Sequence, residues 1–116
     1  MSRILVIDDE RSIRNTLKDI LEYEKYSVEL AEDGIKAFDK IKAASFDVVL
    51  CDIKMPGMDG YTAARKIKEL NPAIPIIGQT AFALEHEVER FKDVFDSYLI
   101  KPIDKNKLRK MLGEFL

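Results

Sequence analysis

The chain has 116 residues, of which 47% are hydrophobic and 34% charged, with 19 basic residues against 21 acidic ones. This length fits one domain over residues 1–116, and the net charge of -2 argues against direct nucleic-acid binding through bulk basic charge and against a polybasic membrane anchor. One cysteine excludes an internal disulfide and a cysteine-rich zinc site, and the composition favours a cytoplasmic protein.

Short apolar runs alternate with longer amphipathic stretches, and each predicts one element. In chain order the first six are a strand at 4–7, a helix with Ile13, Leu17, Ile20 and Leu21 on one face, a strand at 28–31, a helix with Ile35, Phe38 and Ile41, a strand at 48–51, and a helix with Ala63, Ala64, Ile67 and Leu70. The last four are a strand at 74–77, a helix with Leu84, Val88 and Phe91, a strand at 98–100, and a helix with Leu108, Met111, Leu112 and Phe115.

The character of the apolar runs predicts where the strands lie. The first and third runs are continuous and β-branched, as in strands buried on both faces, whereas the second alternates and indicates a position nearer an edge. Pro75 marks the start of its strand, because proline cannot donate a ladder hydrogen bond. Strict alternation of strand and helix predicts an α/β fold with a central parallel five-stranded sheet, in the order 2-1-3-4-5, and helices on both faces.

Polar side chains follow four of the five predicted strands. Asp8 and Asp9 follow the first strand, and Asp52 follows the third. Thr80 and Lys101 follow the fourth and fifth. Each alone has an ordinary explanation, as a helix cap, a turn residue or a solvated charge. Together they are expected at one edge, since the carboxyl ends of parallel strands meet there and open α/β sheets bind ligands at that edge.

Three clustered carboxylates predict a cation between them. Two carboxylates about 4 Å apart repel by roughly 4 kcal/mol at an effective dielectric near 20. An oxygen-only set of ligands suits Mg²⁺, and a carboxylate beside that metal can attack phosphorus to form an aspartyl phosphate. Mg²⁺, Lys101 and the Thr80 hydroxyl would then offer three contacts to the phosphoryl oxygens.

Four segments carry a resemblance to a known family: residues 4–10 (ILVIDDE), 52–60 (DIKMPGMDG), 80–81 (TA) and 98–102 (YLIKP). With these segments at these distances, the chain resembles the receiver domain of two-component response regulators, of the chemotaxis-regulator kind, over essentially its whole length. The resemblance implies a flavodoxin-like (βα)5 fold and a phosphoprotein of phosphorelay signal transduction. It implies no conventional enzyme, since such a domain catalyses only its own Mg²⁺-dependent phosphorylation and dephosphorylation.

The resemblance also implies roles for the residues of the acidic cluster. Asp52 is similar to the phosphoacceptor, which takes a phosphoryl group from the phosphohistidine of a histidine kinase or a histidine phosphotransfer protein. Asp9 resembles the direct Mg²⁺ ligand beside Asp52. Asp8 resembles a ligand that acts through water, and the backbone carbonyl of Lys54 resembles the remaining protein ligand. Lys101 resembles the lysine that binds the phosphoryl group.

The remaining implied roles concern a conformational switch. Thr80 resembles the switch hydroxyl, and Tyr98 resembles the switch aromatic residue that turns inward when Thr80 moves towards the phosphate. The bond that corresponds to Lys101–Pro102 is cis in the family. A downstream output protein or domain would detect the change on the face formed by the fourth helix, the fifth strand and the fifth helix.

Two features depart from a plain receiver domain or leave alternatives open. Val94 and Phe95 stand where the family usually has glycine and alanine, so the usual left-handed cap of the fourth helix is not expected. Acidic residues of the predicted fourth helix contrast with basic residues of the fifth, which fits either a reciprocal homodimer contact or, as we prefer, two solvated faces. These residues are Glu85, Glu87 and Glu89, and Lys105, Lys107, Arg109 and Lys110.

Other functions compete with this interpretation. An aspartate-nucleophile phosphatase typically has a second acid two residues after the nucleophile, where this chain has Lys54. An interaction module that works without phosphorylation would be expected to lack Asp9, Asp52 or Lys101, and all three are present. A flavin-binding module is disfavoured because no Ser/Thr/Gly-rich phosphate loop follows the first strand.

Overall fold

The computed structural model describes residues 2–53, 60–80 and 93–116. Its elements in chain order are β1 (Arg3–Ile7), α1 (Arg11–Tyr23), β2 (Ser27–Ala31), α2 (Gly34–Ala43), β3 (Val48–Asp52), α3 (Gly60–Leu70), β4 (Ile76–Thr80), β5 (Ser97–Ile100) and α5 (Lys105–Phe115). The predicted helix with Leu84, Val88 and Phe91 lies outside the described residues. The other predicted elements are all present.

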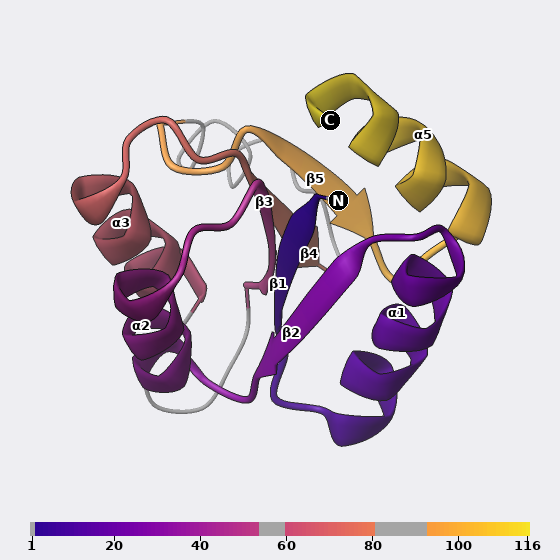
Figure 1. The fold of residues 1–116 in the computed structure, drawn as a ribbon, viewed down its shortest axis with the longest axis horizontal. Helices are drawn as coiled ribbons and strands as arrows, with labels where there is room; N and C mark the ends of the chain where they lie inside the picture. The colour runs from indigo at the N-terminus through magenta and orange to yellow at the C-terminus, as the bar shows by residue number, and fades with distance from the viewer. Residues whose placement is uncertain (1, 54–59, 81–92) are drawn as a thin grey trace.

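Five parallel strands form one sheet in the order β2-β1-β3-β4-β5, which confirms the predicted fold class. Figure 1 shows α2 and α3 on one side of the sheet and α1 and α5 on the other. Each pair of helices covers its own apolar cluster, with Ala37, Ile41, Ala64 and Ile67 on the first side and Leu17, Leu21, Leu108 and Leu112 on the second. The described part of the chain therefore has three layers, as the flavodoxin-like arrangement requires.

The strands at the centre of the sheet are buried, as their apolar runs predict. β3 and β4 are buried along their whole length, whereas β2 at the edge is mostly half-buried. The predicted fourth strand starts two residues too early, since Ile74 and Pro75 precede the ladder that begins at Ile76. Pro75 has no N–H to donate, but its carbonyl accepts a hydrogen bond from the Val49 N–H at 3.0 Å.

Two predicted helix faces need correction. In α2 the buried residues are Gly34, Ala37 and Ile41, while Ile35 is 63% exposed. In α3, Leu70 is 48% exposed at the end of the helix. The small residues of α2 recur at helical spacing and lie on its buried side, where they allow the helix to approach the sheet closely. A pattern built only on large apolar side chains misses such a face.

A glycine in β4, Gly78, leaves room for a bulky residue in the segment before β5, Phe95. Val94 and Phe95 are buried, and the Phe95 ring lies 5.6 Å from the Tyr98 ring. A Cβ at Gly78 would lie 3.1 Å from the Phe95 ring and 3.2 Å from the Tyr98 ring. Phe95 therefore fills space that a side chain at position 78 would need, which is how the chain accommodates a bulky residue where the resemblance implies a small one.

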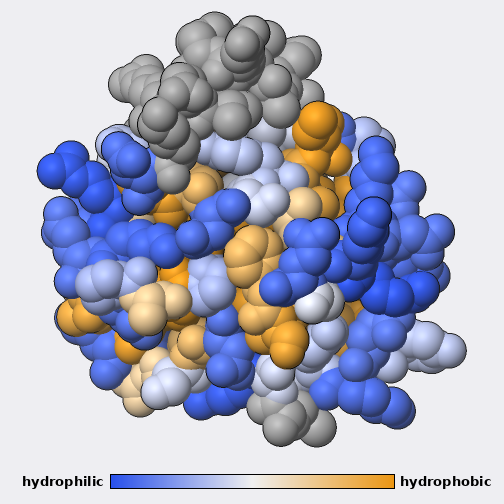
Figure 2. Space-filling model, turned by 90° about the horizontal axis from the view of Figure 1, so that it is seen from above, coloured by the Kyte–Doolittle hydropathy of each residue, from blue (hydrophilic) through white to orange (hydrophobic). Residues whose placement is uncertain are grey.

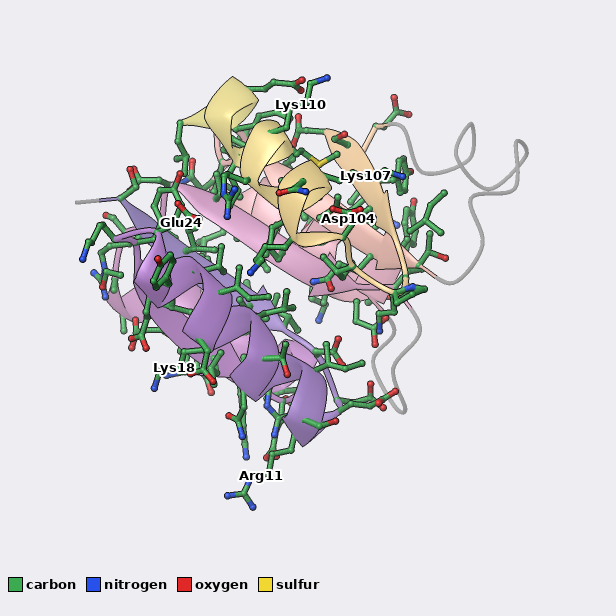
Figure 3. The ribbon with its side chains drawn as sticks, turned by 90° about the vertical axis from the view of Figure 1, so that its right-hand side faces the viewer. Arg11, Lys18, Glu24, Asp104, Lys107 and Lys110 are labelled. Atoms are coloured by element: carbon green, nitrogen blue, oxygen red, sulfur yellow. The ribbon has the colours of Figure 1, made fainter. Side chains whose placement is uncertain are left out.

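The surface of α5 carries the basic residues noted in the sequence. Lys107 and Lys110 project from the helix (Figure 3), whereas Arg109 pairs with Glu24 at the end of α1, with Nε 2.7 Å from Oε1. This contact uses one of the basic residues of α5 within the chain. The acidic residues of the predicted fourth helix lie outside the described residues.

Hydrophilic side chains dominate the face of the molecule shown in Figure 2, where they surround a narrow apolar band. Within residues 2–53, 60–80 and 93–116, no helix combines the length and hydrophobicity that crossing a bilayer requires.

Candidate functional site

Three carboxylates meet where β1 and β3 end side by side. The two strands are neighbours, with Ile7 opposite Cys51. Asp8 and Asp9, which directly follow β1, therefore lie beside Asp52, the last residue of β3. One oxygen from each of these three carboxylates lies within 4.8 Å of the others. The structure thus brings together the acidic residues that the sequence places after these two strands.

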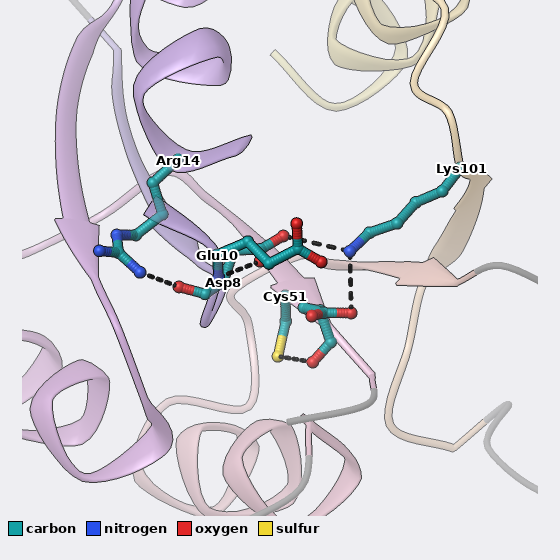
Figure 4. Close-up of polar contacts among 6 residues, drawn as sticks. Asp8, Glu10, Arg14, Cys51 and Lys101 are labelled. Atoms are coloured by element: carbon teal, nitrogen blue, oxygen red, sulfur yellow. Dashed lines mark hydrogen bonds and ion pairs between the residues drawn. The ribbon is translucent and has the colours of Figure 1, made fainter. Parts of the chain in front are cut away.

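Lys101 reaches this cluster from the end of β5. Its Nζ lies 3.3 Å from Asp8 Oδ2 and 3.3 Å from Asp52 Oδ1 (Figure 4). Because β4 lies between β3 and β5, the Lys101 side chain crosses the end of β4 to make these contacts. Its backbone N–H donates to the Thr80 carbonyl at 2.8 Å, and the Lys101–Pro102 peptide bond is cis.

The first turns of α1 hold Asp8 in place. Asp8 is fully buried, and its Oδ1 accepts a hydrogen bond from the Glu10 N–H at 2.9 Å. The Arg14 guanidinium donates to the backbone carbonyl of Asp8 at 2.6 Å (Figure 4). Arg14 is not among the predicted site residues, because a side chain that bonds a backbone carbonyl leaves no pattern in residue types. The available signal is a cation near the start of a helix, where the macrodipole disfavours it.

Thr80 lies at the carboxyl end of β4, whereas Tyr98 is the second residue of β5 and pairs with Gly78. Thr80 is buried at the last position of β4, and the residue before it, Gln79, pairs in register with Asp52. Tyr98 is half-buried in β5, and burial raises the pKa of its phenol. Lys54, whose backbone carbonyl is the remaining predicted ligand, lies outside the described residues.

Gly60 brings the start of α3 against the end of β3. Its N–H donates to the Ile53 carbonyl at 2.8 Å. A Cβ at Gly60 would lie 2.0 Å from the backbone oxygen of Asp52, which no side chain tolerates. Glycine at this position therefore permits the close approach that fixes the backbone around Asp52.

Burial and crowded negative charge control ionisation in the cluster. The pKa of Asp52 is raised to about 6, mainly by burial and then by the charge of Asp8, and the Lys101 ammonium opposes this only in part. Burial alone would lower the pKa of Lys101, but the charges of Asp52 and Asp8 outweigh it, so this pKa lies above its ordinary value. Within the described residues, the cluster offers three carboxylates and no nitrogen or sulfur ligand, a donor set that fits a hard divalent cation such as Mg²⁺.

Comparison with known proteins identifies the family, since the model of the response regulator receiver domain matches residues 4–113. The chain belongs to this family. This receiver domain is 42% identical over 114 residues to the transcriptional regulatory protein ZraR of Klebsiella oxytoca, in a match that covers 97% of this chain and 26% of that protein. The chemotaxis protein CheY4 of Vibrio cholerae has a TM-score of 0.96 at 31% identity, covering 100% of this chain and 99% of CheY4.

A third relative was solved with ligands. The response regulator TrrA of Thermotoga maritima, in complex with Mg(2+)-BeF, has a TM-score of 0.92 at 34% identity and full coverage of both chains. The receiver domain described here spans about a quarter of the length of the curated ZraR relatives that it matches. Its acidic cluster and Lys101 lie inside the region matched by the family model.

Proposed function

We propose that this receiver domain is a phosphoacceptor in a two-component phosphorelay. Asp52 would take a phosphoryl group from the phosphohistidine of a histidine kinase or a histidine phosphotransfer protein. The observation that carries the proposal is the placement of Asp52, a buried carboxylate 3.3 Å from the Lys101 ammonium and clustered with Asp8 and Asp9. A carboxylate in this setting can act as a nucleophile, with a cation in place to bind the oxygens of the incoming group.

The transfer makes one bond and breaks one. A carboxylate oxygen of Asp52 attacks phosphorus in line with the leaving group, and the P–N bond of the phosphohistidine breaks as the O–P bond forms. The imidazole nitrogen keeps the electron pair of the broken bond. Lys101 binds a phosphoryl oxygen, and Thr80 offers its hydroxyl as a second donor. With a pKa of about 6, Asp52 is mostly ionised at neutral pH and able to attack.

The donor set supports Mg²⁺ as the cofactor. Asp9 and Asp52 would bind the ion directly, Asp8 would act through water, and the Lys54 carbonyl would complete the protein ligands. Bound Mg²⁺ supplies charge neutralisation at the phosphoryl oxygens. The complex of TrrA with Mg(2+)-BeF, in a chain 34% identical to this one, supports the assignment.

The phosphorylated form would be detected at the face that includes β5 and α5. Thr80 moves towards the phosphoryl oxygens and Tyr98 turns inward, so that phosphorylation selects one of two arrangements of this face. An output protein or domain reads the selected arrangement. The receiver domain catalyses only its own phosphorylation and dephosphorylation, and a cytoplasmic location fits these partners.

Incubation with acetyl phosphate and Mg²⁺ tests the proposal. Intact-mass spectrometry should show one added phosphoryl group on the parent protein and none on the Asp52→Ala variant. Asp19→Ala, which removes an exposed carboxylate of α1, is the matched control and should be modified like the parent. A parent that stays unmodified, or modification that persists in Asp52→Ala, would overturn the proposal and favour an interaction module that works without phosphorylation.

Mg²⁺ alone is expected to stabilise the folded protein. A ligand that binds only the folded state stabilises it by about 2.7 kcal/mol at a hundredfold excess over its Kd. The melting temperature of the parent should rise during a MgCl₂ titration, while that of Asp9→Asn should rise much less. Asp19→Asn should respond like the parent. An undiminished rise in Asp9→Asn would show that the ion binds elsewhere.

A further inference from the structure

Gln79 carries a buried side chain that the proposed function does not use. It lies in β4, is 0% exposed, and neither its amide nitrogen nor its amide oxygen has a hydrogen-bond partner within the described residues. Buried polar side chains are nearly always hydrogen-bonded, because an unpaired donor or acceptor destabilises the fold. An unpaired carboxamide inside the sheet therefore points to a partner gained in another state of the protein.

The strand register places this carboxamide on the same face of the sheet as Asp52. Gln79 pairs with Asp52 on one side and with Leu99 on the other. Side chains alternate between the two faces along a strand. Ile77, two residues before Gln79, packs in the cluster under α1 and α5, and so does Leu50, two residues before Asp52. Gln79 and Asp52 therefore share the face that α1 and α5 cover.

Lys101 passes over the same part of β4. Leu99, two residues earlier, packs in the cluster under α1 and α5, so Lys101 leaves β5 on that face. Its ammonium reaches Asp52 on β3, and β4 is the strand between them (Figure 4). At this level the β4 residue on that face is Gln79, since Gly78 faces the opposite cluster. The carboxamide consequently lies beneath the path of the Lys101 side chain.

We propose that Gln79 is a positioning residue for Lys101 as the phosphoryl group is transferred to Asp52 and in the phosphorylated state, an inference that rests on the proposed function. The ammonium has three N–H donors and here contacts the carboxylates of Asp8 and Asp52. A phosphoryl group on Asp52 draws the ammonium away from Asp8. The amide oxygen of Gln79 accepts the N–H that is released, which holds the ammonium against the phosphoryl group.

The Gln79→Met variant tests this inference, because methionine has nearly the same length without the polar atoms. The unphosphorylated variant should melt roughly 4 °C above the parent, since an unpaired buried amide is removed. Its phosphorylation by acetyl phosphate should nevertheless be about tenfold slower, because a hydrogen bond to a charged group is lost. Ile77→Met, on the same strand and face, is the matched control and should leave the rate unchanged.

A double-mutant cycle separates positioning from a structural role. In a Lys101→Met background, Gln79→Met should have no further effect on the rate, because no ammonium remains to be positioned. Equal slowing in both backgrounds, or a parent-like rate in Gln79→Met, would overturn the inference and leave the proposed function intact. A parent that is never phosphorylated would overturn both. Gln79→Leu, measured in parallel, guards against a folding defect peculiar to methionine.

Discussion

At about pH 7.5 and without divalent cations, the Asp52→Asn variant is expected to unfold at a higher temperature than the parent protein. Asp52 is 5% exposed and its pKa is raised to about 6, so its ionisation at neutral pH destabilises the folded state. The difference between this pKa and the ordinary value of 3.8 corresponds to a destabilisation of about 3 kcal/mol when Asp52 is ionised. We expect on the order of 2 kcal/mol of this to be recovered, because the asparagine amide that replaces the carboxylate is itself a polar group that must be buried.

The stability advantage of Asp52→Asn over the parent should shrink as the pH falls. Folded Asp52 takes up its proton near pH 6 and the unfolded chain does so near 3.8, so the folded state binds more protons between these values. The parent therefore gains stability relative to Asp52→Asn as the pH falls through 6, and the advantage of the variant should approach zero near pH 4. Thermal melts across this range measure the effect, with Asp19→Asn as control. An advantage that persists or grows on acidification would contradict the ionisation described for Asp52.

Replacing Lys101 by methionine is expected to slow phosphorylation by acetyl phosphate about 100- to 1000-fold, as the loss of one preorganised donor does at other charged transition states. The Lys101 ammonium lies 3.3 Å from the carboxylate oxygen of Asp52 and is positioned to bind the phosphoryl group as it arrives. Methionine keeps most of the aliphatic packing and removes the charge. The rate of mass gain at saturating Mg²⁺ measures the effect.

The same variant should be less stable than the parent, the opposite of Asp52→Asn. Asp8 is fully buried, and without Lys101 both it and Asp52 lose their shared cation. Lys107→Met removes an exposed lysine of α5 and should change neither the rate nor the melting temperature. A Lys101→Met variant that is phosphorylated at the parent rate, or is more stable than the parent, would show that the ammonium does not act on this cluster.

Residue patterns were sufficient to predict the sheet and its acidic edge. Continuous β-branched runs identify β1 and β3 as central strands. Because the carboxyl ends of parallel strands lie at the same edge of a sheet, the sequence alone places Asp8, Asp9 and Asp52 together. The buried face of α2 could not be predicted in the same way. Its small residues, such as Ala37, carry almost no hydrophobic signal, while the larger Ile35 is exposed.

The finer details of the site depend on contacts that residue types do not encode. Arg14 bonds a backbone carbonyl, and every residue offers the same carbonyl, so no motif marks the pair. Gln79 looks like an ordinary polar residue after an apolar run until the register shows it between Asp52 and Leu99. Sequence patterns indicate whether a side chain favours burial or solvent. The contact of Arg14 and the position of Gln79 depend instead on which residues the fold brings next to them.

The close approach of Phe95 to Gly78 implies that these two positions cannot be exchanged independently. A chimaera that took β4 from a relative with a larger residue at position 78 would force that side chain against Phe95 and Tyr98. A chimaera that took only the segment before β5, with a small residue at position 95, would leave a void beside Tyr98. Grafts of this half of the domain should therefore carry β4 and β5 together as one unit.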